Sequence, residues 1–120
     1  MTAMEVGQAL VAAAREGGEA AMTFIRQYYD DEIVSIEPAS GRTEGIEKVA
    51  ASNAGFYRDF EIHAYVVEGP FVGVRADQFV VRFYLDVTPP GEARIRLTEV
   101  GIYTLRGSTI VQEEFLYLDE

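Results

Sequence analysis

A period of two runs through residues 79–86, Phe-Val-Val-Arg-Phe-Tyr-Leu-Asp. Successive side chains of a strand point to opposite sides, so one face of this strand carries the large apolar residues, Phe79, Val81, Phe83 and Leu85. Residues 95–105 repeat the pattern, with Ile95, Leu97, Glu99, Gly101, Tyr103 and Leu105 on one face. Thr88-Pro-Pro-Gly-Glu92 lies between the two runs and is rich in turn residues. Together they predict a long antiparallel hairpin with one core-facing side.

Charge decides between two registers for this hairpin that keep the core faces matched. One register places two arginines opposite each other, and the other places Asp86 opposite Arg94. Like charges that face each other destabilise a sheet, whereas a favourable cross-strand pair contributes roughly 0.2–1 kcal/mol. We therefore expect the second register, which brings Glu99 near Val81.

Helical periodicity dominates the first half of the chain. We expect helices over residues 3–16, 19–28 and 44–58, and strands over 33–37, 60–68, 72–87, 93–106 and 109–118. Thr2 and Glu5 have the spacing of a capping box, and Gly17-Gly18 is suited to end the first helix. Strands grouped after helices indicate an α+β fold with a largely antiparallel sheet, in a single domain over residues 1–120.

The composition excludes several classes of function. Asp plus Glu number 20 and Lys plus Arg number 10, a formal net charge of −10, so the clustered positive charge that nucleic acids or acidic membranes require is missing. The chain has no Cys and a single His, His63, which excludes thiolate and multi-His metal sites. Residues 1–11 include Glu5 and no basic residue, so we do not expect them to be a signal peptide. We expect a cytoplasmic protein without metal or other cofactor. Its expected partners are apolar small molecules or copies of itself, and the acidic charge leaves a basic protein open as well.

Three local motifs occur in a particular order along the chain. Residues 29–38 read YDDEIVSIEP, residues 41–46 read GRTEGI, and residues 105–114 read LRGSTIVQEE. These motifs and the element order resemble the nuclear transport factor 2-like superfamily, in its SnoaL-like and ketosteroid isomerase-like branch. The resemblance implies a cone-shaped, curved sheet wrapped around three helices, an apolar pocket inside it, and frequent dimers. It implies no single reaction, because this scaffold hosts many.

The resemblance carries one functional residue over clearly. In the isomerases a general-base carboxylate precedes the proline of the first motif, and Glu37 precedes Pro38 here. The place of the family's second acid is Gly101, and the place of its oxyanion tyrosine is aliphatic, near Leu10 and Val11. One of the three isomerase groups is therefore matched. The alternative interpretation of Glu37 is an exposed residue at a strand end, without a catalytic role.

Glu99 is a second candidate catalytic carboxylate, because it shares a strand face with core residues. Burial there raises the pKa of a carboxyl group, as a general acid or base requires. The alternative is an ion pair or a strand end open to water. A tight turn at Gly107-Ser108 turns Glu114 toward the same side, whereas one bulge would turn Glu113 inward instead.

The remaining candidates would bind the substrate rather than react with it. Asn53 lies on the buried stripe of the third helix and must bond a ligand, a water or backbone, since an unpartnered buried amide costs roughly 1–3 kcal/mol. We expect pocket-lining residues among Asn53, Tyr57, Phe79, Phe83 and Tyr103. Val80, Val100 and Ile102 make the outer sheet face half apolar, which predicts a homodimer through the sheet.

Two functions follow from these residues. The first is a cofactor-free isomerase, cyclase or hydrolase that moves a proton with Glu37 or Glu99 on an apolar substrate. The second is a non-catalytic domain of the same fold that binds a ligand or dimerises. The unmatched strand acid and oxyanion tyrosine favour the second function, and the inward carboxylates favour the first.

Overall fold

The computed structural model describes residues 1–73 and 75–118. In this part of the chain the elements are α1 (Ala3–Glu16), α2 (Gly18–Tyr28), β1 (Tyr29–Glu37), β2 (Gly41–Glu44), α3 (Ile46–Asp59), β3 (Glu61–Val72), β4 (Gln78–Thr88), β5 (Ile95–Arg106) and β6 (Thr109–Leu118). None of these helices is long and apolar enough to cross a membrane.

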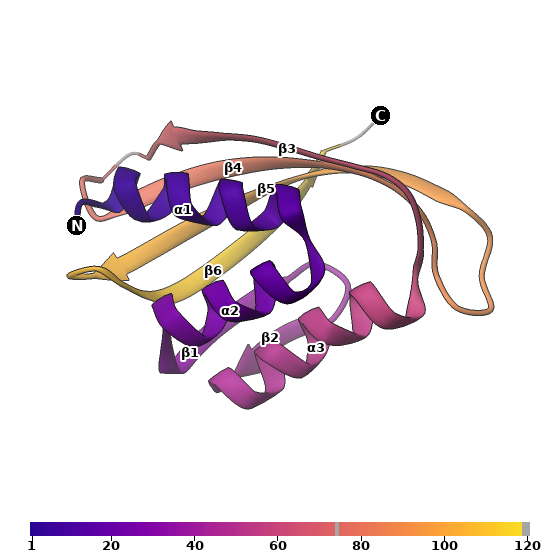
Figure 1. Ribbon diagram of the computed structural model, residues 1–120, viewed down its shortest axis with the longest axis horizontal. Coiled ribbons are helices and arrows are strands. Elements are labelled where there is room, and N and C mark those ends of the chain that lie inside the picture. Colours follow the sequence, from indigo (N-terminus) through magenta and orange to yellow (C-terminus); the bar gives the residue numbers. More distant parts are fainter. Residues whose placement is uncertain (74, 119–120) are drawn as a thin grey trace.

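The strands form a six-stranded sheet in the order β2-β1-β6-β5-β4-β3. Every neighbouring pair is antiparallel except β1 and β6, which run parallel. The sheet curls over the three helices, and the β4–β5 hairpin curves toward the C-terminal end of α3 (Figure 1). The predicted α+β class and curved, mainly antiparallel sheet around three helices are therefore confirmed.

Local sequence signals explain how the first helix begins and ends. The Thr2 hydroxyl accepts a hydrogen bond from the Glu5 backbone N–H at 3.1 Å, and the Glu5 carboxylate accepts one from the Thr2 backbone N–H at 2.9 Å. This capping box satisfies two N–H groups that a helix start leaves free. Gly17 ends the helix with φ +73°, a backbone conformation that residues other than glycine rarely adopt.

The core lies between the concave face of the sheet and the helices. Its fully buried side chains include Val6, Ile33, Phe79, Val81 and Ile110. Burying a large apolar side chain contributes about 1.5–3 kcal/mol, so this layer holds α1 against β4 and the C-terminal strands. The predicted core faces of β4 and β5 both point inward, because they pair in phase along the hairpin.

The register of the β4–β5 hairpin differs from the predicted one. Phe83, rather than Val81, lies opposite Glu99, and Asp86 lies opposite Arg96. Asp86 still forms its ion pair with Arg94, at 2.8 Å, and a weaker one with Arg96, at 3.4 Å. The Arg94 side chain is long enough to reach Asp86 diagonally across the two strands. The ion pair therefore forms although Arg94 and Asp86 are not directly opposite each other, contrary to the register that we expected.

Several element boundaries also differ from the prediction. Strand β2 was not predicted, because residues 41–43 lay outside every expected strand and residue 44 was expected to begin a helix. Helix α3 begins at Ile46 rather than residue 44, and β3 continues to Val72 instead of ending at residue 68. Strand β4 begins at Gln78, not at residue 72. Residue 74 of that predicted strand and residues 119–120 of the predicted domain lie outside the described part of the chain.

A bulge near the start of β6 decides which glutamate faces inward. The β5–β6 register shifts between Thr104 and Leu105, so that Gly101 pairs with Phe115. Glu113 is consequently buried, with 7% of its surface exposed, while Glu114 faces the outer side. The expectation based on a tight, regular hairpin is wrong here, and the bulged alternative is correct.

The outer face of the sheet carries apolar side chains that the helices do not cover. Val66 is 47% exposed and Leu116 is 48% exposed. Val80, Val100 and Ile102 on the strands between them are partly exposed. The homodimer expected through this face stays a prediction.

Candidate functional site

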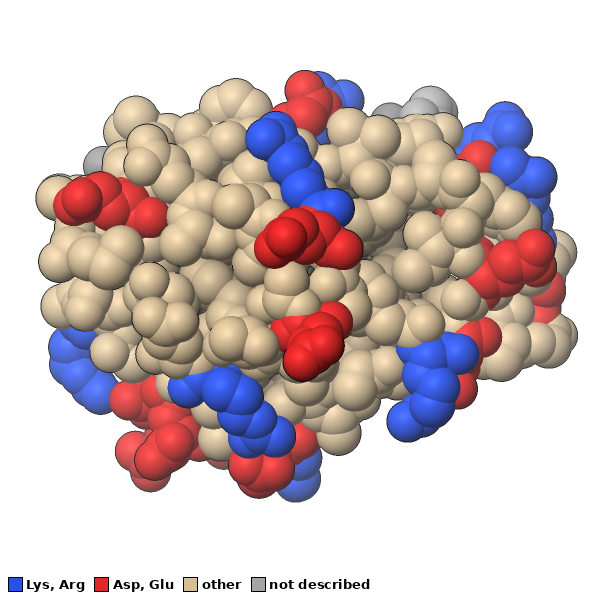
Figure 2. Space-filling model, in the orientation of Figure 1, with Lys and Arg blue, Asp and Glu red and all other residues tan. Residues whose placement is uncertain are grey.

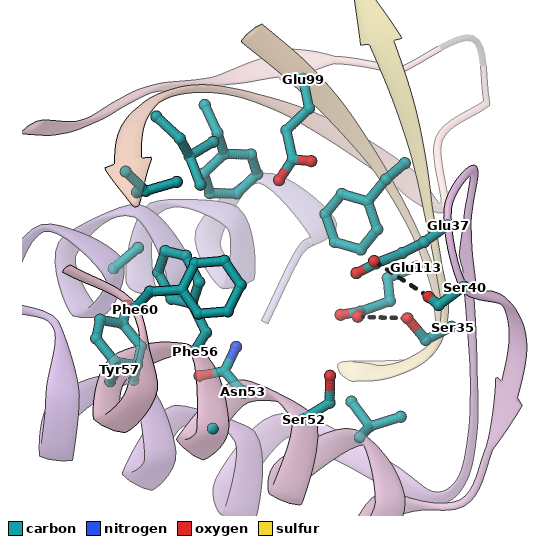
Figure 3. Close-up of a pocket in the computed structure, with 18 of the residues that line it drawn as sticks. Ser35, Glu37, Ser40, Ser52, Asn53, Phe56, Tyr57, Phe60, Glu99 and Glu113 are labelled. Atoms are coloured by element: carbon teal, nitrogen blue, oxygen red, sulfur yellow. Dashed lines mark hydrogen bonds between the residues drawn. The ribbon is translucent and has the colours of Figure 1, made fainter. Parts of the chain in front are cut away.

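A cavity of about 640 Å³ lies between the concave face of the sheet and the helices. All three helices contribute to its wall, and the turn between β4 and β5 reaches it through Pro89, Pro90 and Glu92. Aromatic rings and carboxylates make up much of the lining (Figure 3). Its volume is in the range that holds a drug-sized organic molecule.

Glu99 projects from β5 into this cavity (Figure 3). The ladder places Phe83 of β4 on one side of it and Tyr117 of β6 on the other. Across residues 1–73 and 75–118, no hydrogen bond or ion pair to its carboxylate is formed. Burial, together with the nearby charges of Glu37 and Glu113, raises the pKa of Glu99 to about 7.

Glu113 enters the same cavity from β6 but is held in place. Its carboxylate accepts hydrogen bonds from the Tyr29 hydroxyl and, at 2.9 Å, from the Ser35 hydroxyl. Burial raises the pKa of Glu113 to about 7, although these two hydrogen bonds act in the opposite direction. The oxygen atoms of Glu113 are therefore already bonded to the protein, whereas those of Glu99 are free to meet a ligand.

Glu37 completes a group of three carboxylates that come from β1, β5 and β6 (Figure 3). It lies at the last position of β1, where the Ser40 hydroxyl donates a long hydrogen bond of 3.4 Å to it. The negative charge of Glu37 raises the pKa of both Glu99 and Glu113. Sequence reasoning named Glu37 and Glu99 independently, and the fold brings them to one cavity.

Asn53 faces the carboxylates from α3, on the opposite wall (Figure 3). Its Oδ1 atom is buried and has no hydrogen-bond partner among the described residues. A buried polar atom without a partner destabilises a fold by about 1–3 kcal/mol, so such an atom calls for an explanation. Of the three partners that the sequence left open for Asn53, backbone is therefore not the one that satisfies Oδ1.

The predicted lining residues separate into two groups. Tyr57, Phe83 and Tyr103 line the cavity. Phe79 does not line it, because this side chain is fully buried and stacks on Tyr103, with ring centroids 4.9 Å apart. Phe79 therefore supports the wall from behind.

Gly101 lies at the position where the resemblance expects a second acid. A Cβ atom built there would lie 2.9 Å from Tyr103 Cε2 and 3.1 Å from Phe115 Cε1. The space that a side chain would need is therefore filled by two rings. Glu99, two residues earlier on the same strand face, and Glu113 on the neighbouring strand bring carboxylates to the cavity instead.

Sequence reasoning missed the two hydroxyl groups that hold Glu113. Ser35 had a usable signal, because it alternates in phase with Ile33 and Glu37 on β1 and therefore shares their face. Tyr29 had none, since the β1–β6 register shifts between Tyr29 and Val34.

The described part of the chain holds no group of three or more His, Cys, Asp or Glu side chains suited to a metal ion. On the face seen in Figure 2, most blue Lys and Arg side chains lie beside red Asp or Glu side chains, and they do not form an extended basic patch.

The family model of the SnoaL-like domain matches residues 1–117, and the chain belongs to this family. A candidate SnoaL-like polyketide cyclase from Mesorhizobium loti is 31% identical, with a TM-score of 0.85 and coverage of 98% of this chain and 100% of that one. No curated protein matches the chain.

Two more distant solved structures share the fold alone. An LEH-like epoxide hydrolase from M. tuberculosis is 12% identical, with a TM-score of 0.71 and coverage of 97% of this chain and 82% of that one. A protein with a ketosteroid isomerase-like fold from Catenulispora acidiphila, in complex with trimethylamine, is 17% identical. Its TM-score is 0.68, with coverage of 94% of this chain and 85% of that one.

Proposed function

We propose that this protein catalyses cofactor-free proton transfer on a small organic molecule, with Glu99 as the group that takes up and returns the proton. The observation that carries the proposal is the Glu99 carboxylate, which points into an aromatic-lined cavity with no partner among the described residues. A general base works best when its pKa lies near the operating pH, and the pKa of Glu99 is raised to about 7.

The other two carboxylates support this role in different ways. Glu113 is fixed by two hydroxyl groups and acts as a positioning residue, whose proximity helps keep the proton affinity of Glu99 high. Glu37 contributes a second negative charge from the end of β1. Neighbouring carboxylates in unequal environments can divide their work in this way. Here the division follows from hydrogen bonding, because Glu113 is held by two hydroxyl groups and Glu99 is not.

Proton removal from carbon leaves negative charge on the substrate, and α3 offers groups to receive it. The amide of Asn53 and the hydroxyl of Ser52 face the cavity opposite the carboxylates (Figure 3). Hydrogen-bond donors fixed in a cavity that excludes water stabilise such charge strongly, since they need no reorganisation during the reaction. A substrate whose apolar body packs against the aromatic rings of the wall would displace water from the same space.

The test uses 5-nitrobenzisoxazole, a probe on which a carboxylate base acts without a cofactor. Removal of its ring proton breaks the N–O bond and releases a coloured phenolate. We expect the protein to accelerate this reaction over acetate at the same pH, and Glu99→Gln to lower the rate at least about 100-fold. Glu68→Gln, an exposed glutamate outside the cavity, is the matched control and should leave the rate unchanged. Wild-type activity in Glu99→Gln would refute the role of Glu99.

A second candidate function is ligand binding without catalysis. Gly101 favours it, because the position of the expected strand acid is filled by the rings of Tyr103 and Phe115. This candidate predicts that an organic probe binds to the cavity while the rate of proton removal stays at the acetate level. The same assay, combined with a binding measurement, therefore separates the two candidates.

A further inference from the structure

The cavity wall has one sign of charge. Five acidic side chains line it, namely Glu37, Asp59, Glu92, Glu99 and Glu113, and no Lys, Arg or His among the described residues does so. Of these five, only Asp59 forms an ion pair within residues 1–73 and 75–118, with Arg58 at 2.8 Å. The interior negative charge is therefore left without a cation from this part of the chain.

Aromatic rings surround Glu99, whose carboxylate has no hydrogen bond or ion pair among the described residues. Phe83 and Tyr117 flank Glu99 on the two neighbouring strands. Tyr65 extends the same wall, with its ring centroid 6.1 Å from that of Phe83. A ring face attracts a cation through its negative quadrupole, most strongly where water is excluded. A cation beside Glu99 would therefore meet a carboxylate and ring faces together, whereas a neutral group would gain from the rings alone.

Asn53 is an uncharged polar residue on the opposite wall. Its Oδ1 atom is buried on the wall of the same cavity and accepts no hydrogen bond from the described residues. The amide nitrogen of Asn53, not Oδ1, is turned toward the cavity (Figure 3), so Asn53 adds a polar group to the wall but no charge. The charged groups of the lining are carboxylates, which match a ligand that brings positive charge.

We infer that the cavity takes an organic amine, protonated at neutral pH and attached to an apolar body. The cation would lie at Glu99 and Glu37, and the apolar body against the aromatic wall. Asp59 and Glu92 are exposed where the lining reaches the end of α3 and the β4–β5 turn, so they add negative potential that favours the approach of a cation. The inference rests on the proposed function, because it names the substrate class of the same cavity, but it concerns charge selection rather than proton transfer.

Three probes with one aromatic body test the inference by calorimetry. Benzyltrimethylammonium is a permanent cation, 2-methyl-1-phenyl-2-propanol is its neutral counterpart of similar shape, and phenylacetate is an anion. We expect the cation to bind at least about tenfold more tightly than the alcohol, and the anion to bind most weakly. A smaller preference for the cation, or no binding of the cation at millimolar concentration, would overturn the inference.

Two variants test whether Glu99 and Glu37 cause the preference for a cation. Glu99→Gln and Glu37→Gln should each weaken binding of the cation at least about threefold and leave binding of the alcohol unchanged, which also shows that the cavity is intact. Glu68→Gln should change neither. Equal cation affinity in both variants and the wild type would overturn the inference. Benzyltrimethylammonium has no role in the proton-transfer assay, so its preference is measured whether or not the proposed catalysis is found.

Discussion

Glu99 on β5 lies directly opposite Phe83 on β4, and both side chains face the cavity. This pairing sets a carboxylate beside an aromatic ring instead of beside a cation. Ionising the carboxyl there is unfavourable, because burial reduces its hydration and no Lys, Arg or His among the described residues lines the cavity. The pKa of Glu99 is consequently raised from 4.5 to about 7, with Glu37 and Glu113 adding to the effect of burial. The same arrangement underlies the proton transfer and the cation selection proposed above.

The rate of proton removal should depend on pH with a midpoint near 7. Only the deprotonated carboxyl is a base, so the rate should rise as pH passes the raised pKa of Glu99 and then level off. Glu37→Gln removes one negative charge that raises this pKa, so it should move the midpoint to lower pH. The pH dependence of 5-nitrobenzisoxazole turnover measures both values. An unchanged midpoint in Glu37→Gln would contradict the coupling between the two carboxyl groups.

The protein should be less stable at pH 8 than at pH 5. The pKa values of Glu99 and Glu113 are about 7 in the folded chain and 4.5 without the fold, so between these values the folded state holds more protons. Rising pH therefore favours unfolding, by at most about 3 kcal/mol for each carboxyl. Urea unfolding at the two pH values measures the difference. Glu113→Gln should reduce it, and a variant with the full wild-type difference would show that Glu113 is not its source.

Gly101→Ala should destabilise the fold by about 1–3 kcal/mol. The added methyl group would lie 2.9 Å from Tyr103 Cε2, so the ring must shift within a packed wall. Gly55→Ala is the matched control, since the nearest atom to its added methyl, Arg58 Nη2, is 3.7 Å away and the residue lies inside helix α3. That control should stabilise the protein by up to about 1 kcal/mol. Equal urea midpoints for the two variants would contradict the tight packing at Gly101.

Asn53→Leu should raise the free energy of unfolding by about 1–2 kcal/mol while lowering turnover. The substitution removes a buried acceptor that has no partner among the described residues, and it adds apolar surface of similar size. Ser52→Ala, at the exposed neighbouring position of α3, should change the free energy of unfolding by less than about 0.5 kcal/mol. Urea unfolding and the proton-removal assay together make the test. A destabilised Asn53→Leu variant would mean that the amide is satisfied in the free protein.

Much of the fold could be predicted because its signals are periodic. The alternation in residues 79–86 identifies the inward face of β4, and the spacing of Thr2 and Glu5 identifies the start of α1. Strand β2 lacks such a signal, since residues 41–44 are polar and largely exposed at the sheet edge. The hairpin register was wrong because a long arginine side chain can reach Asp86 from more than one position.

The site residues that could be predicted are those whose strand face follows from the alternation of side chains, or whose position follows from a motif. Glu37 and Glu99 needed only a motif position and a strand face. The inward orientation of Glu113 depends on one bulge, and no residue type in the hairpin indicates that bulge. From the sequence, Glu113 and Glu114 therefore stayed alternatives. The unpartnered Oδ1 of Asn53 depends on what the neighbouring elements place around it, which a helical stripe alone does not specify.

Both proposals depend on a Glu99 carboxyl that titrates near neutral pH, and carbon NMR of this carboxyl measures its pKa directly. Spectra of protein labelled at the glutamate carboxyl carbons, recorded from pH 4 to 9, would assign the resonance by its loss in Glu99→Gln. We expect a midpoint near 7 that moves to lower pH when benzyltrimethylammonium is bound. A midpoint near 4.5, the ordinary glutamate value, would contradict this expectation.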